Sequence, residues 1–234
     1  MIGLNLTVAL LGVTILFGAG GSADNSPDPG TVALATRVRH FDMQDGTVLD
    51  GISQLSTESV DLSFSFEEAL RAKFSDPPVP QWRFGLRLDD HTIVEILDAL
   101  CSKDVNYVWA REGLTINVYP RATADDSSYL PNRRLSEFDV RRVTDAEQAV
   151  FAAVAQLPSP FEQIACAQAG SDTSYPVPWD AAFRDLTVRQ AFNLIARHLG
   201  ARGGWLLAGS QDFRTIGFHR GRIHYSSRQP GSTE

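Results

Sequence analysis

Four short amphipathic helices are predicted by the spacing of apolar residues along the chain. In each stretch, apolar side chains recur every three or four positions directly after a threonine, which is typical of a helix with one buried face. Three residues after each threonine stands Asp, Glu or Gln. This is the spacing of a capping box, in which both side chains bond backbone amides at the helix start. The four predicted boxes are Thr47/Asp50, Thr92/Glu95, Thr144/Glu147 and Thr187/Gln190.

Strands are predicted around these helices by alternating apolar and polar residues. Around the first two helices the segments are VRHFDM, VDLSFSF, WRFGLRL, NYVWA and LTINVY. Around the last two they are EFDV, FEQIACA, WDAAF, GWLLA and RTIGFH, with weaker alternation. The chain therefore reads β-α-β-β-α-β-β twice.

Matching landmarks recur in the same order in the two halves of the chain. Phe41 of a Phe-Asp pair corresponds to Phe138, and Thr115 of a Thr-Ile pair corresponds to Thr215. Pro-Val-Pro with a tryptophan close behind it also occurs twice. Several landmarks repeated in one order indicate an internal repeat. We expect an α+β protein of two tandem small β-α-β-β-α-β-β units, each with two helices packed on small mixed sheets.

The predicted boundaries follow from these landmarks. The first unit spans residues 37–120 and the second spans 134–220, with a polar linker at 121–133 between them. Another polar linker, 24–36, precedes the first unit, and a polar tail, 221–234, follows the second. Each unit is long enough to form a modest core of its own.

The two Pro-Val-Pro segments are predicted to lie where the chain crosses to the strand before the second helix of each unit. Proline suits such a crossing because it fixes φ and cannot donate to a sheet ladder. Trp82 and Trp179 follow these segments, and we expect them to begin that strand and pack on the core of their unit. A polyproline-II ligand for an aromatic groove is the alternative interpretation.

On these motifs the first unit resembles the secretin and TonB short N-terminal domain, and the second unit resembles it more loosely. The matching segments of the first unit are FDMQDGTVLDGISQLSTESVDLSF, LRLDDHTIVEILDALCSKDVNYVW and EGLTINVYP. The resemblance implies the fold of that domain, an exported and envelope-associated role, and recognition of another protein.

The first 23 residues carry no charged side chain and include the apolar run LTVALLGVTILFGAG. A run of this length followed by small residues is typical of a secretory signal, which predicts export to the periplasm. Cleavage would follow Ala19 or Ala23. Because no Lys or Arg precedes the run, an uncleaved membrane anchor or a wrongly chosen start codon stays open. Membrane contact is expected only through residues 1–23 or through the partner.

The overall charge argues against a nucleic-acid partner. The 234 residues carry a formal net charge of −7, whereas binding to phosphates requires a clustered basic surface.

Residues with catalytic or metal-binding chemistry form no recognisable motif. His219 and His224 are two conceivable metal ligands, but no third ligand is spaced to join them. Cys101 and Cys166 are the only cysteines; export would permit a disulfide, yet both stand in apolar segments, which favours two free thiols. Adjacent carboxylates point in different directions on a regular element and make no acid–base pair. We expect no catalytic, cofactor-binding or metal-binding residue, no cofactor, and no enzyme.

The predicted function is a non-catalytic exported module that binds another protein in the cell envelope, in transport or signalling. A small open sheet leaves unpaired backbone groups on its edges, which a partner strand can complete. The predicted edges are GLTINVY and RTIGFH, and proline at Thr115 or Asn117 should abolish capture without unfolding the domain. The partner would be a secretin or TonB-type envelope component, or a second copy of the chain. The alternative is a ring-forming homo-oligomer of an envelope secretion machine, and an enzyme or metal-binding protein ranks third.

Overall fold

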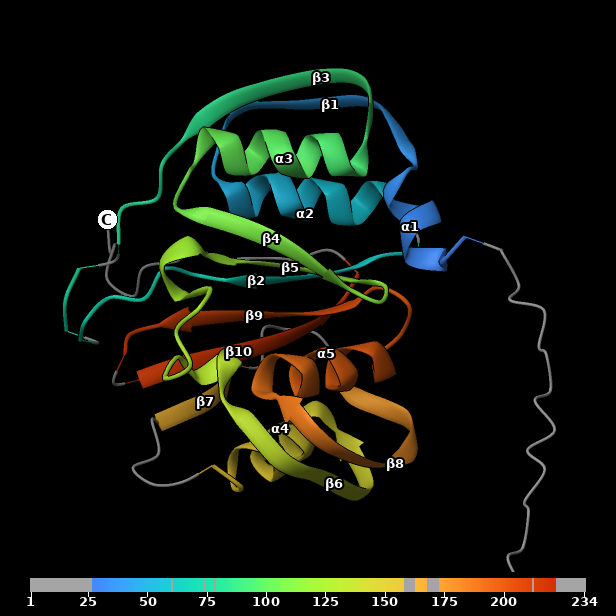
Figure 1. The fold of residues 1–234 in the computed structure, drawn as a ribbon, viewed down its shortest axis with the longest axis vertical. Helices are drawn as coiled ribbons and strands as arrows, with labels where there is room; N and C mark the ends of the chain where they lie inside the picture. Colours follow the sequence, from blue (N-terminus) through green and yellow to red (C-terminus); the bar gives the residue numbers. More distant parts are fainter. Residues whose placement is uncertain are drawn as a thin grey trace, which may run out of the picture.

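The computed structural model describes residues 27–59, 61–73, 75–77, 79–157, 163–167, 173–211 and 213–221. This part of the chain is a mixed α/β protein (Figure 1). Its helices are α1 (Pro29–Leu34), α2 (Val48–Glu58), α3 (Ile93–Lys103), α4 (Ala146–Val154), α5 (Val188–His198) and the 3-10 helices η1 (Arg121–Thr123) and η2 (Leu130–Asn132). Its strands are β1 (Arg37–Gly46), β2 (Ser63–Glu67), β3 (Phe84–Thr92), β4 (Tyr107–Glu112), β5 (Thr115–Pro120), β6 (Arg134–Asp145), β7 (Gln163–Ala167), β8 (Ser174–Thr187), β9 (Gly203–Gly209) and β10 (Phe213–Arg220). The predicted signal peptide or anchor, 1–23, lies outside the described residues.

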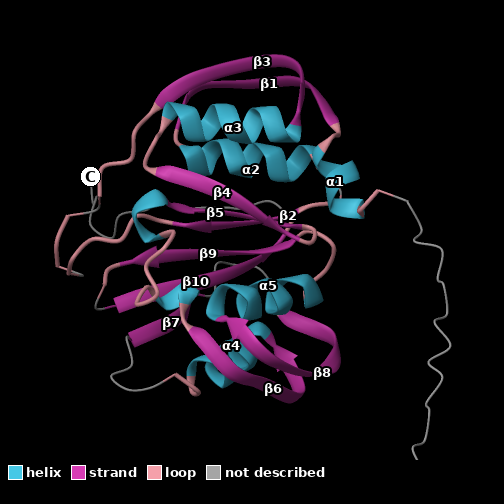
Figure 2. Cartoon of the chain, viewed as in Figure 1, coloured by secondary structure: helices cyan, strands magenta, loops and turns pink. Residues whose placement is uncertain are grey.

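The described strands form two small sheets and one large one (Figure 2). β1 pairs with β3, and β6 pairs with β8, each in antiparallel fashion. The other six strands form a single sheet in the order β4-β5-β2-β9-β10-β7. Strands expected to form separate small sheets in each half are therefore joined into one sheet, through the parallel pairing of β2 with β9.

Two helix pairs pack on these sheets, each with its own core. α2 and α3 contact both the β1–β3 sheet and the β4-β5-β2 half of the large sheet (Figure 1). α5 contacts β8 and β9, and α4 packs beside it on β6. The first core includes the fully buried Phe41, Ile52 and Leu97, and the second includes the fully buried Phe138 and Phe192. The amphipathic stripes of the sequence thus bury one face of each helix.

The centre of the large sheet is covered on both faces. On β2, Phe64 and Phe66 belong to the core beneath α2 and α3. Side chains alternate along a strand, so Ser65 and Glu67 point to the opposite face, where Glu67 bonds Arg189 of α5. The two helix pairs therefore approach the large sheet from opposite sides.

The predicted helix starts are largely confirmed. Three capping boxes form as predicted, at Thr47/Asp50, Thr92/Glu95 and Thr187/Gln190. The box at Thr144/Glu147 is wrong by one residue, because Asp145 caps α4 and its Oδ1 accepts from the Gln148 backbone N at 2.8 Å. A carboxylate and a threonine hydroxyl compete at adjacent positions here, and both are favoured caps.

The tryptophans after the two Pro-Val-Pro segments differ in their surroundings. Trp179 lies in β8, is 8% exposed and stacks on His198 with ring centroids 3.9 Å apart, which confirms its predicted packing. Trp82 is 64% exposed and lies in the loop before β3, so that prediction was wrong. Pro176 and Pro178 lie within β8 itself, so the predictions that Pro-Val-Pro precedes this strand and that Trp179 begins it were wrong. A two-stranded sheet tolerates these prolines because each strand keeps one unpaired side.

Both predicted linkers contain ordered structure. Within 24–36, Asp28 caps α1, whose Ala33 and Leu34 are buried in the first core. Within 121–133, Tyr129 and Leu130 are buried in the second core. The polar composition of these segments gave no sign of the apolar contacts, because each segment adds only two or three buried side chains.

Candidate functional site

The large sheet has two free edges among the described residues, formed by β4 and β7. The predicted edges GLTINVY and RTIGFH correspond to β5 and β10, which are interior strands, so that prediction was wrong. β2 and β7 pair in parallel with β5 and β10 on the side away from the hairpin partner, and strand order along the sequence does not reveal this. Thr115 and Asn117 are buried, so proline at either residue would break the interior of the sheet.

The β4 edge directs unpaired backbone groups outward. Arg121 N donates to the Asn106 carbonyl at 2.6 Å, which sets the alternation of the antiparallel β4–β5 ladder. By this alternation Trp109 and Arg111 point their N–H and C=O groups away from β5. The Arg111 guanidinium pairs with the Asp28 carboxylate beside α1, so this side chain carries no uncompensated charge at the edge.

The β7 edge is uncharged. Its sequence is QIACA, and Ile164, Ala165 and Cys166 are half-buried. Edge strands of soluble proteins are commonly protected by lysine, proline or inward-pointing charge. None of these protects β7 within the described residues, where only β10 pairs with its backbone.

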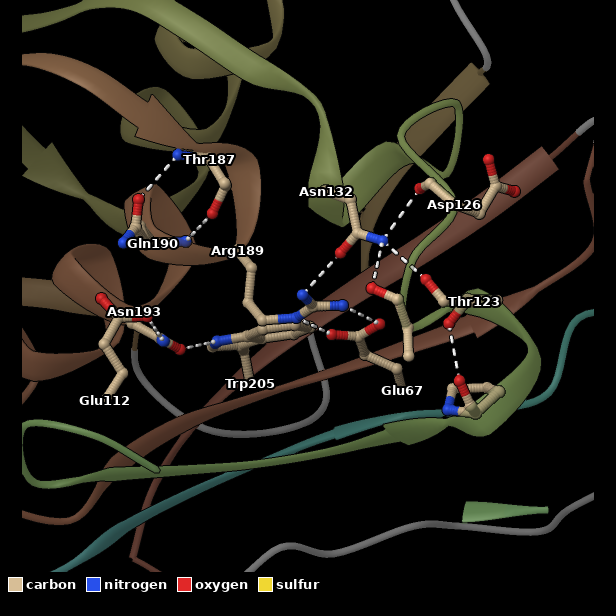
Figure 3. A network of polar contacts seen from close by, with 12 residues as sticks. Glu67, Glu112, Thr123, Asp126, Asn132, Thr187, Arg189, Gln190, Asn193 and Trp205 are labelled. Carbon is tan, nitrogen blue, oxygen red and sulfur yellow. Dashed lines mark hydrogen bonds and ion pairs between the residues drawn. The ribbon is translucent and has the colours of Figure 1, made fainter. Parts of the chain in front are cut away.

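A buried ion pair joins the two halves of the large sheet next to β2 and β9 (Figure 3). Arg189 donates from Nε to Glu67 Oε1 at 2.6 Å and from Nη2 to Oε2 at 3.1 Å. Its Nη1 donates to Asn132 Oδ1 at 2.6 Å, and its guanidinium lies 4.4 Å from the centroid of the Tyr119 ring. The side chain of Glu67 is 1% exposed and that of Arg189 is 14% exposed. A bidentate pair of this kind fixes orientation as well as charge.

A second bridge runs through Asn193 on the same helix (Figure 3). Its Nδ2 donates to Glu112 Oε2 at 3.1 Å, and its Oδ1 accepts from Trp205 Nε1 at 2.7 Å. Asn193 and Trp205 are fully buried. Two polar side chains of α5, Arg189 and Asn193, therefore bond the β4-β5-β2 half of the sheet.

Two carboxyl groups at this junction, those of Glu67 and Glu112, are held by donors from α5. Burial raises the pKa of Glu67, against the opposing effect of Arg189, and burial likewise raises the pKa of Glu112. Each carboxyl has a hydrogen-bond donor from α5. Glu67 also interacts with the buried Tyr129 hydroxyl, and burial together with the Glu67 charge raises the pKa of Tyr129. These contacts hold α5 and the linker against β2.

A cavity of about 340 Å³ lies between the segment 120–129 and the residues after β2. Its lining is Ala69, Leu70, Pro120, Ala122, Thr123, Asp126, Ser128, Tyr129, Gln211 and Arg214. The Asp126 carboxylate accepts from both the backbone N and the hydroxyl of Ser128, which is the pattern of a turn. This lining provides no histidine or cysteine for catalysis.

The histidine pair does not form a described site. His219 is buried, and its Nδ1 lies 3.0 Å from the Gly221 carbonyl oxygen. His224 lies outside the described residues. No group of three or more His, Cys, Asp or Glu side chains that could hold a metal ion occurs within the part of the chain that the structure describes.

Both cysteines are free, as the sequence favoured. Burial raises the pKa of Cys101 and of Cys166 from 9.0 to about 12. Because the thiolate is the reactive form, we expect each thiol in the folded protein to react with iodoacetamide at pH 8 about a thousandfold more slowly than after unfolding. Mass spectrometry of timed samples measures this, and equal rates in native and denatured protein would contradict it.

Comparisons with family models, curated proteins and solved structures found no match to this chain. Among the described residues, no helix combines the length and apolar character needed to cross a membrane. The resemblance to the secretin and TonB short N-terminal domain stays a prediction from the motifs of the sequence.

Proposed function

We propose that the chain consists of two copies of one β-α-β-β-α-β-β unit, residues 37–120 and 134–220. The first support is the register of the two small sheets, β1–β3 and β6–β8. The residues that pair in one sheet correspond to the residues that pair in the other. The corresponding pairs are Arg37↔Thr92 with Arg134↔Thr187, and Phe41↔Leu88 with Phe138↔Phe183. Matching sequence landmarks at matching sheet positions are the signature of a repeated supersecondary unit.

An unusual backbone conformation also recurs. Asp90 and Asp185 both have positive φ, +57° and +59°, and each stands two residues before a capping threonine. Each is held by the first residue of its small sheet: Arg37 Nη1 donates to Asp90 Oδ2 at 3.1 Å, and Arg134 Nε donates to Asp185 Oδ1 at 2.8 Å. Aspartate tolerates this left-handed conformation better than most residues.

A hydrogen bond from a tryptophan to the second helix recurs as well, exposed in the first half and buried in the second. Trp109 Nε1 donates to Asp98 Oδ1 at 2.8 Å, and Trp205 Nε1 donates to Asn193 Oδ1 at 2.7 Å. In each half the tryptophan lies on the strand after the second helix, and its acceptor lies six residues after the capping threonine. The second acceptor is an amide, which leaves a donor that reaches Glu112 across the junction.

The function that this geometry supports best is a non-catalytic protein-interaction module that recognises a partner by strand addition. The observation that carries it is the pair of free edges, β4 and β7, at the two ends of one continuous sheet. Each edge offers backbone donors and acceptors that an added strand can satisfy, with side-chain pockets giving specificity.

The setting proposed for this module is the cell envelope, in transport or signalling. The apolar segment within residues 1–23 supports export to the periplasm, and the resemblance to the short N-terminal domain supports a secretin or TonB-type partner or self-association. The net charge of −7 favours a protein over a nucleic acid as the partner.

Replacing Arg111 by proline tests the β4 edge. The change removes an outward N–H while leaving the β4–β5 ladder intact, since this residue does not bond β5. A lost ladder bond that leaves its partner unsatisfied costs about 1 to 3 kcal/mol, so we expect capture of envelope proteins by the tagged chain to fall about tenfold or more. Pull-down from envelope extracts with quantitative mass spectrometry measures the captured secretin or TonB-type component.

The matched control is Arg111→Ala, which loses the ion pair to Asp28 but keeps the backbone donor. This variant should capture partners as the parent does, and both variants should keep the far-ultraviolet circular dichroism of the parent. Undiminished capture by a folded Arg111→Pro protein would reject strand addition at β4.

A further inference from the structure

We propose that the strand that completes each free edge belongs to a second copy of this chain, with β7 of one copy pairing in parallel with β4 of the next. This inference rests on the proposed function, because it names the partner of the same two edges.

The template is the junction that already exists inside the chain. β2 and β9 pair in parallel through Phe66↔Leu206 and Glu67↔Leu207, and Glu68 N donates to the Leu207 carbonyl at 2.8 Å. In the proposed repeat, β2 and β4 of the first half correspond to β7 and β9 of the second half. The internal junction therefore joins the same two kinds of edge that remain free at the ends of the sheet. A head-to-tail contact of this kind can repeat without limit, because every added copy of the chain leaves one edge free for the next.

The internal register predicts the register between copies. Two residues before Phe66↔Leu206, Phe64 stands opposite Gly204, and a side chain at Gly204 would overlap the Phe64 carbonyl oxygen. Cys166 takes the place of Phe64, since each pairs with the isoleucine of a Thr-Ile landmark. Val108 takes the place of Gly204, since each precedes the repeated tryptophan. Cys166 should therefore lie nearest Val108 of the next copy. Because Val108 carries a side chain where the internal junction has a glycine, the two strands must stand further apart there than β2 and β9 do at Gly204, which makes the contact weaker than the internal junction.

The chemistry of the two edges suits this contact. β7 is uncharged, and Val108 is apolar and half-buried, so no charge loses its water at the predicted meeting point. The place of Arg189, two residues after the capping threonine, is taken in α3 by Val94. The contact between copies thus lacks the buried ion pair of the internal junction and depends on backbone pairing and apolar contact. We expect it to be reversible.

The geometry also fixes the type of assembly. Neighbouring strands of a sheet are rotated in one hand by about 20 to 25°, so a six-stranded chain contributes a rotation of about 120 to 150°. Strands about 4.8 Å apart give a rise of about 29 Å per chain along the same axis. Rotation and translation along one axis generate an open helical fibre, whereas a closed ring requires a rotation without rise.

A photo-reactive benzoylphenylalanine in place of Val108 tests the contact. Full-length chain is mixed with the same chain labelled with nitrogen-15 and irradiated, so that cross-links between copies carry both isotopes. We expect such cross-links to map to residues 163–167, and Arg111→Pro in the same chain should remove them. Benzoylphenylalanine in place of Val105, which is exposed just before β4, is the matched control and should give none to β7. Light scattering of the unmodified chain should show a mass that rises with concentration without reaching a fixed number of copies.

Two outcomes would overturn the inference. One is a chain that remains monomeric or stops at one defined oligomer over the accessible concentration range; the other is a set of cross-links between copies that map away from β7. If copies do not pair while Arg111→Pro still loses an envelope partner, the inference fails and the proposed function stands. If copies pair through β4 and β7 but capture of envelope proteins is unaffected by Arg111→Pro, the envelope partner is rejected and self-pairing stands.

Discussion

Replacing Glu67 by alanine is expected to lower the free energy of unfolding by about 3 to 5 kcal/mol, the cost of leaving one member of a buried ion pair without its partner. Arg189 would keep its charge in a site where 14% of its side chain is exposed, and Asn132 and the Tyr119 ring would remain beside it without a carboxylate to balance the charge. Urea unfolding followed by circular dichroism measures the loss.

Two controls distinguish the stability lost with the buried ion pair from the stability lost with any charged side chain. Arg83→Ala breaks an exposed pair with Asp45 and should cost less than about 1 kcal/mol. The double variant Glu67→Leu with Arg189→Met removes both charges and should recover most of the loss, since apolar side chains can replace a buried pair. If Glu67→Ala costs no more than Arg83→Ala, the pair does not support the junction.

Replacing Gly204 by alanine is expected to separate the two halves of the large sheet. The added Cβ would overlap the Phe64 carbonyl oxygen and press on the His219 ring, and a backbone atom of β2 cannot move aside without breaking the β2–β9 pairing. Overpacking of this kind costs about 3 kcal/mol. We expect the parent chain to unfold in one transition and the variant in two, as measured by scanning calorimetry.

Gly200→Ala provides the comparison for this experiment. Gly200 has φ of +136°, and an added Cβ there meets no atom within 4 Å. The substitution should cost about 1 to 3 kcal/mol through backbone strain and keep a single transition. One transition in Gly204→Ala as well would show that the two cores do not depend on the β2–β9 pairing for their cooperativity.

Local structure could be predicted from the sequence because its signals lie within a few residues of one another. Three of four capping boxes and the approximate positions of the strands follow from such short patterns. The cap of α4 was misplaced because Thr144 and Asp145 offer equivalent chemistry at adjacent positions. Trp82 was misplaced because proline-rich loops and strand starts have the same local composition.

The junction could not be predicted, because its partners are far apart in the sequence. Glu67 and Arg189 are 122 residues apart, and each looks ordinary in its own segment. The one local signal is that Glu67 ends the strand SFSFE, every residue of which is buried; sequence alone does not show that burial. The free edges were missed for a related reason, since β2 pairs with β5 although three other elements, β3, α3 and β4, lie between them in the chain.

The ion pair between Asp28 and Arg111 joins the N-terminus of α1 to the edge strand β4 of the large sheet. Whatever is attached before residue 27 is held within a few residues of β4, since α1 is fixed there by Asp28 and by its buried Leu34.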